Sequence, residues 1–154
     1  IVMVMIGEIF ASSARLNRKA NDNYNAQSDA QNLMTLIQNE VRYANSVTIT
    51  GGDPVSFGAG KRYIYAEDGV VMKNMGASPD DARNMIAGTK DFTYGIEFKK
   101  SSPKSLSVEI AVNAAGKELY TMQTDIYINN LILSSVSGES GKTVEYTIPA
   151  GEPR

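Results

Sequence analysis

The sequence contains neither cysteine nor histidine, and each absence removes a class of chemistry. Without cysteine there is no thiol nucleophile and no disulfide, and without both residue types the usual zinc ligands are missing. Histidine is also the commonest general base of enzymes. A formal net charge of −2 and a pI of about 5.2 give no sign of nucleic-acid binding. We therefore expect no enzyme, no cofactor and no specific nucleic-acid partner.

Helix-breaking residues are missing from the beginning of the chain. Residues 8–50 contain no glycine and no proline, which predicts one continuous helix over residues 1–46. At about 1.5 Å per residue this helix would be roughly 65 Å long, about twice the width of a small domain. The head that we expect over residues 47–154 can cover only part of it. The rest of the helix needs a partner, a membrane, or both.

The apolar pattern divides this helix into three parts. Residues 1–11 are apolar nearly all round and too few to span a bilayer, so we interpret them as the second half of a longer membrane anchor. Residues 12–32 are polar and should lie in solvent or against polar neighbours. Residues 33–46 carry apolar residues at helical spacing and should dock on the head. We expect membrane and assembly contacts from Ile1, Val2, Met3, Val4, Met5, Ile6, Ile9 and Phe10, and a helix–sheet core from Leu33, Leu36, Ile37, Val41 and Ala44.

Three cations follow the apolar segment. Arg15, Arg18 and Lys19 stand where a helix leaving a membrane would meet lipid head groups. The alternative interpretation is an ordinary amphipathic first helix that packs on its own domain.

The remaining sequence has the alternation typical of strands. Ser78-Pro79 followed by acidic residues predicts a short helix reaching about Met85, and Asp68-Gly69 predicts a hairpin turn. The order of elements predicts an α+β fold, in which a long N-terminal helix packs at its C-terminal end on an antiparallel β-sheet. The expected strands are residues 46–50, 62–66, 70–73, 92–100, 105–113, 119–130 and 144–148.

Two segments superficially match ligand-binding motifs. Residues 138–143, Gly-Glu-Ser-Gly-Lys-Thr, are similar to the end of a P-loop, but Val136 stands where that loop requires glycine and a strand pattern follows instead of a helix. Asp80, Asp81 and Asp91 match no calcium loop. We expect neither nucleotide nor metal binding.

The clearest resemblance is carried by residues 36–47, LIQNEVRYANSV, which look like the I-x-x-E-(I/V)-R-x-A-x-S-V ending of a pilin helix. Residues 121–130, TMQTDIYINN, look like a late strand of the same proteins. Together with the apolar segment and long helix, these residues make the chain resemble the type IV pilin and pseudopilin superfamily, and most of all a minor pilin.

The resemblance implies a structural subunit of a pilus, or of a pseudopilus for secretion or DNA uptake, which contributes to filament assembly or to the filament tip through its N-terminal helix. Its N-terminal helix would first hold it in the bacterial cytoplasmic membrane by a single pass, with the head extracytoplasmic. The helix would then pack against other pilin or pseudopilin subunits in a filament at the cell surface. The alternative is a membrane-anchored extracytoplasmic ligand-binding or sensor domain on a helical stalk, which would need a concave apolar pocket in the head.

Overall fold

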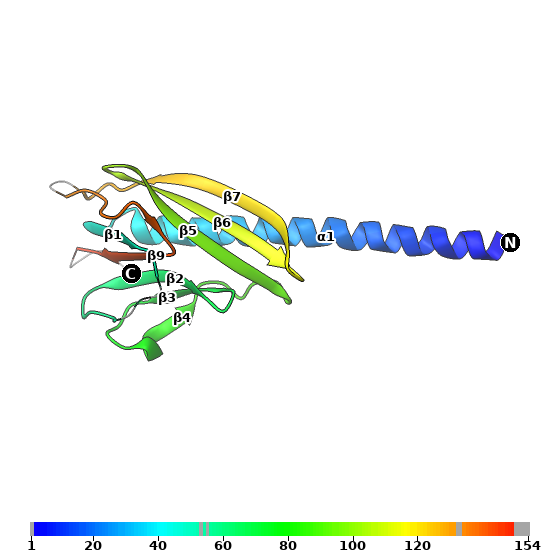
Figure 1. The fold of residues 1–154 in the computed structure, drawn as a ribbon, viewed down its shortest axis with the longest axis horizontal. Coiled ribbons are helices and arrows are strands. Elements are labelled where there is room, and N and C mark those ends of the chain that lie inside the picture. The colour runs from blue at the N-terminus through cyan, green and yellow to red at the C-terminus, as the bar shows by residue number, and fades with distance from the viewer. Residues whose placement is uncertain (1, 53, 55, 132–133, 150–154) are drawn as a thin grey trace.

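One long helix, α1 (Val2–Val41), begins the chain and enters a β-rich head at its C-terminal end (Figure 1). The computed structural model describes residues 2–52, 54, 56–131 and 134–149, and within α1 it describes the side chains of residue 8 and of residues 11–41. The helix ends at Val41 rather than at residue 46, because the chain must turn there to begin a strand. Ala44 N donates to Val41 O at 3.0 Å in this turn.

The head contains two antiparallel sheets instead of the one that the sequence suggested. The first has the order β1-β9-β2-β3-β4 and the second the order β7-β6-β5-β8. The first sheet consists of β1 (Ser46–Thr50), β2 (Arg62–Glu67), β3 (Val70–Asn74), β4 (Ala82–Asn84) and β9 (Thr143–Thr147). The second consists of β5 (Phe92–Ser102), β6 (Ser105–Ala114), β7 (Lys117–Tyr127) and β8 (Ser140–Gly141).

The predicted strands are present, with ends that shift by a few residues, and the predicted hairpin is confirmed. Glu67 pairs with Val70, which leaves Asp68 and Gly69 as a two-residue turn. Both turn residues have positive φ, 50° and 75°, as a type I′ hairpin turn requires. The hairpin also touches the second sheet, because Tyr94 N donates to Gly69 O at 2.7 Å.

The short helix expected after Ser78 is wrong in length. Ser78 does cap a helical turn, with its hydroxyl accepting from Asp80 N, but the turn is a 3-10 helix that covers only Pro79–Asp81. Ala82 is already extended, and residues 82–84 pair with β3 as an edge strand. Pairing with an existing strand satisfies backbone groups that a longer helix would have left at the surface.

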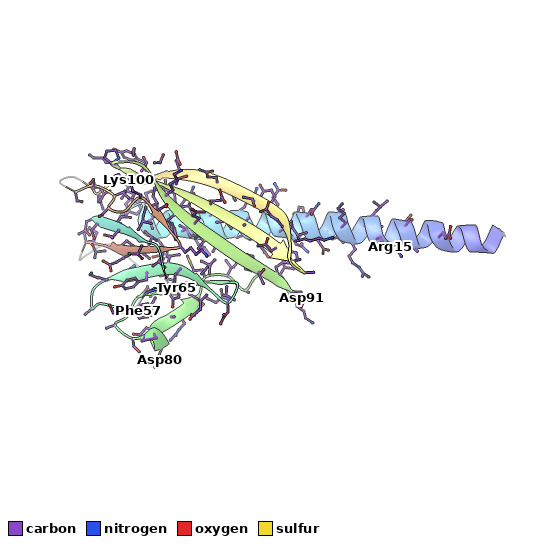
Figure 2. All side chains as sticks on the ribbon, viewed as in Figure 1. Arg15, Phe57, Tyr65, Asp80, Asp91 and Lys100 are labelled. Atoms are coloured by element: carbon purple, nitrogen blue, oxygen red, sulfur yellow. The ribbon has the colours of Figure 1, made fainter. Side chains whose placement is uncertain are left out.

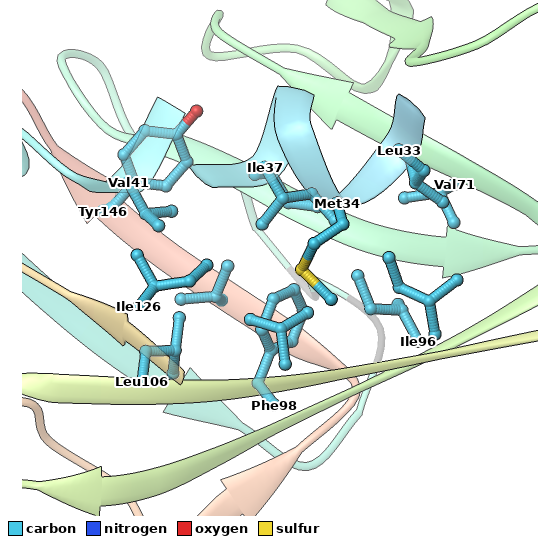
Figure 3. Packing of buried hydrophobic residues seen from close by; sticks show 14 of the residues in the cluster. Leu33, Met34, Ile37, Val41, Val71, Ile96, Phe98, Leu106, Ile126 and Tyr146 are labelled. Carbon is cyan, nitrogen blue, oxygen red and sulfur yellow. The ribbon is translucent and has the colours of Figure 1, made fainter. Parts of the chain in front are cut away.

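The main core lies where α1 faces both sheets. Figure 3 shows Leu33, Met34, Ile37 and Val41 of the helix packed with side chains from both sheets, among them Val71, Phe98 and Tyr146. The outward side of the second sheet is polar, with Glu97, Lys99, Glu109 and Gln123 exposed. The head therefore has one buried interior, and the docked part of α1 is its central element.

Candidate assembly interface

The N-terminal part of α1 extends away from the head, well past the ends of β5, β6 and β7 (Figure 1). Every side chain from Ala11 to Asn21 is exposed, and beyond them Tyr24 is 72% exposed. The side chains expected to contact membrane or partner helices, Ile1 to Ile6, Ile9 and Phe10, lie outside the described part of the structure. Among the described residues, no helix has both the length and the apolar content that a membrane span requires.

Contact between the helix and the head begins earlier than the sequence indicated. Ala26 and Ala30 are completely buried, although both belong to the segment that we expected to be polar and solvated. Their small side chains let the helix backbone approach the head closely. The docked part of the helix therefore begins near Ala26 and not at Leu33.

The expected helix–sheet core residues differ in one position. Leu33, Ile37, Val41 and Ala44 have no exposed surface, whereas Leu36 is 38% exposed. Leu36 is one residue away from Ile37, about 100° around the helix, so it points past the sheets rather than between them. It lines a groove of about 230 Å³ together with Met75 and Met85.

Glu40 connects the helix to three strands of the first sheet. Tyr146 OH of β9 donates to Glu40 Oε2 at 2.8 Å, and Lys73 Nζ of β3 donates to Glu40 Oε1. Arg62 Nη1 of β2 lies 3.7 Å from Glu40 Oε2. Burial, followed by the negative charge of Glu40, raises the pKa of the Tyr146 hydroxyl above its usual range. One carboxylate thus fixes the last helical turns against β2, β3 and β9.

Asp29 makes a second polar connection, to the segment that leads into β5. Asp29 Oδ2 accepts from Tyr94 OH at 2.7 Å and from the backbone N–H of Thr89 at 2.8 Å. Gly88 has φ 61°, and a Cβ atom there would lie 2.6 Å from Tyr94 OH. Only glycine therefore allows the chain to pass this close to the tyrosine hydroxyl.

Asp29 and Glu40 are eleven residues apart, which is close to three helical turns, so both carboxylates project from one side of α1. Between them lie the apolar contacts of Leu33 and Ile37. A force applied along the helix would be resisted by two polar connections, roughly 16 Å apart, and by the core between them. From the sequence, Glu40 was expected only as part of the pilin-like motif of residues 36–47, and no role was expected for Asp29.

The C-terminal end of the helix is held by the segment after β7, the second stretch that carried the family resemblance. Asn129 N donates to Arg42 O at 2.9 Å, and Asn130 Nδ2 donates to Tyr43 O at 2.9 Å. Carbonyl groups at a helix C-terminus lack partners within the helix. The two asparagines supply donors just beyond that end, and this explains physically why the two stretches of sequence occur together.

Alkaline pH should destabilise the protein through Tyr94. Desolvation, with the hydrogen bond to Asp29 second, raises the pKa of Tyr94 to about 12, whereas an unfolded tyrosine titrates near about 10. A raised tyrosine pKa favours the neutral hydroxyl in the folded state. Its contribution to stability is therefore complete below pH 10 and is lost as the pH rises towards 12, by on the order of 2 kcal/mol.

Urea unfolding followed by circular dichroism between pH 8 and 12 measures this effect. Tyr94→Phe should reduce the loss of stability with pH, whereas Tyr127→Phe, at a side chain that is 58% exposed, should leave it unchanged. An identical pH profile for Tyr94→Phe and the parent protein would contradict the prediction.

The P-loop-like segment is occupied by strand structure. Residues 140–141 form β8 and residues 143–147 form β9, so no helix N-terminus faces a phosphate site. Thr143 is buried, and its hydroxyl donates to Gly52 O at 2.7 Å. A P-loop would need that hydroxyl for Mg²⁺. Among the described residues no group of acidic side chains is arranged to hold a metal ion.

Calorimetric titration with Mg-ATP or Mg-GTP should therefore give no heat of binding. Lys142, the residue in the position of the P-loop lysine, is exposed and can be changed without disturbing the core. Micromolar affinity that Lys142→Ala abolishes would overturn our interpretation of residues 138–143 as a strand-forming segment without a nucleotide site.

Comparison with known protein-family models finds no match to this sequence, and comparison with curated proteins finds none either. Among solved structures, the fold is similar to that of a mutant of the PilB minor pilin from Streptococcus sanguinis, with a TM-score of 0.60 and 13% sequence identity over 83% of this chain. The chain spans 35% of the length of that protein. The α+β, pilin-like fold expected from the sequence is thus confirmed.

Proposed function

We propose that this protein is a structural subunit of a type IV pilus or a related pseudopilus, of the minor pilin kind, and that it enters the filament through its N-terminal helix. The observation that carries the proposal is the shape of α1. Its docked part begins near Ala26, while every described side chain from Ala11 to Asn21 is exposed. The helix is therefore long enough to pack on the head at one end and to contact a partner at the other.

Residues 2–25 amount to roughly 36 Å of helix, and the described side chains from Ala11 to Asn21 within it are all exposed. Ile1, Val2, Met3, Val4, Met5, Ile6, Ile9 and Phe10 make the first part of this segment apolar, and apolar surface of that extent requires lipid or protein to cover it. Before assembly the segment would be part of a membrane anchor with the head extracytoplasmic. Afterwards it would pack against the helices of other pilin or pseudopilin subunits at the cell surface.

The connections of Glu40 and Asp29 support this role. A filament subunit must transmit load between its helix and its head. The helix is attached to three strands of one sheet through Glu40, and to β5 and the segment before it through Asp29. A flexible attachment would allow the head to move independently of the filament axis.

The anchored-sensor alternative receives no comparable support. Three grooves lined by described residues have volumes of 230, 310 and 190 Å³, at or below the lower end of the range typical of small-molecule sites. The test that separates the two proposals is incorporation of full-length protein into filaments when a charge is placed in the apolar segment. A filament subunit should be lost from the filament fraction, whereas a sensor would never have been in it.

A further inference from the structure

Arg15, Arg18 and Lys19 form a cationic cluster on the exposed part of α1. Residues three and four apart lie on one side of a helix, so the three side chains share a single face. All three are exposed, and Figure 2 shows Arg15 on the extended part of the helix, away from the head.

Within the part of the chain that the structure describes, the charges of this cluster take part in no ion pair. Within the described residues the ion pairs involve Lys61, Arg62 and Lys73, and none of the three helix cations takes part. Asp22 is one turn further along and Glu8 two turns earlier, and neither forms an ion pair with another described residue. The helix segment from Ala11 to Asn25 thus carries three cations and one carboxylate.

The position of the cluster along the helix is as informative as its charge. Arg15 lies four residues, or about 6 Å, beyond the end of the apolar segment at Ala11. Ala26, where the head begins to cover the helix, lies roughly 10–16 Å beyond the cluster. The cations therefore lie between the apolar segment of residues 1–11 and the head. Because this part of the helix extends away from the head, all three side chains are accessible.

Resting on the membrane stage of the function proposed above, we propose that Arg15, Arg18 and Lys19 bind the phosphate groups of anionic phospholipids before the subunit enters a filament. Guanidinium groups bind phosphate through paired hydrogen bonds, and the lysine ammonium adds a third positive charge. The contact would fix how deeply the apolar segment enters the bilayer and hold the head roughly 10 Å above its surface. Because these contacts are electrostatic, assembly could break them without disturbing the head.

The test is binding of the full-length chain to vesicles of phosphatidylcholine alone and of phosphatidylcholine with one third phosphatidylglycerol, in 50 mM salt. The measured quantity is the ratio of the two partition coefficients, in which the contribution of the apolar segment largely cancels, and the charge of Glu8 is the same in the parent and in every variant. Each cation near an anionic surface is worth roughly fivefold in binding, so the three together give on the order of 100-fold. Salt at 500 mM should remove most of this preference.

The triple variant Arg15→Gln, Arg18→Gln, Lys19→Gln should lose most of the preference for phosphatidylglycerol. The matched control Lys99→Gln, Lys104→Gln, Lys142→Gln removes the same charge from exposed lysines of the head and should keep it. An unchanged ratio in the first variant would overturn the proposal. If that variant also associated with itself more weakly in detergent while its vesicle preference stayed unchanged, the cluster would instead bind acidic groups of a neighbouring subunit, and the lipid proposal would again be overturned.

Failure of the function proposed above has a different signature. If the parent protein bound neither kind of vesicle, its membrane stage would be contradicted, and this inference with it. Equal binding to both kinds would leave the membrane stage intact and contradict only the role of the cations.

Discussion

Replacing Ile37 with alanine should lower the free energy of unfolding by about 2–5 kcal/mol. Ile37 has no exposed surface and lies in the centre of the helix–sheet core (Figure 3). Truncation removes buried methyl and methylene groups and leaves a cavity that the rigid sheets around it can only partly close. The loss would be a large share of the 5–15 kcal/mol by which a typical domain is stable.

Leu36→Ala is the matched control, because it removes a similar number of atoms from the adjacent residue, which is 38% exposed. Urea unfolding of both variants at neutral pH measures the difference. A loss at Leu36 as large as that at Ile37 would mean that the groove beside Met75 and Met85 is as well packed as the interior. A loss below about 1 kcal/mol at Ile37 would contradict the central position of the helix in the core.

The parts of the fold that follow from local pattern could be predicted. Alternation marked the strands, and Asp68-Gly69 marked the tight hairpin, because both signals depend on residues close together in the sequence. The division into two sheets could not be predicted. It depends on β9 pairing between β1 and β2. These strands are far apart in the sequence, and the alternation within each strand does not indicate which strands pair.

The docked part of the helix was misplaced for a related reason. Ala26 and Ala30 are buried in a segment whose other residues are mainly polar, and an alanine alone does not distinguish a buried face from a solvated one. The eleven-residue spacing of Asp29 and Glu40 was a usable signal. Two carboxylates on the same side of a helix as apolar core residues indicate buried polar partners. Their partners Tyr94 and Tyr146 are far away in the sequence, so only the structure identifies them.

The largest functional effect should come from a charge in the N-terminal segment. Residues 1–11 are apolar apart from Gly7 and Glu8, and described contact with the head begins only near Ala26. Whatever covers the segment in the assembled state, lipid or neighbouring helices, would have to desolvate an added carboxylate without offering it a partner. That costs several kcal/mol per site in a packed core or in hydrocarbon, and the cost recurs in every copy.

Ile6→Asp and Ile9→Asp in the full-length protein should therefore abolish incorporation into filaments while the head folds normally. Filament fractionation with immunoblotting measures the first effect, and circular dichroism of the head the second. Thr121→Asp is the matched control, since it adds the same charge to an exposed position of β7 and should not impair incorporation. Deletion of residues 1–11 should leave the thermal midpoint of the head nearly unchanged, because the docked part of α1 begins some fifteen residues later. A large fall in that midpoint would show that the segment packs on its own head. Normal incorporation of both aspartate variants would exclude assembly through this helix and favour the anchored sensor.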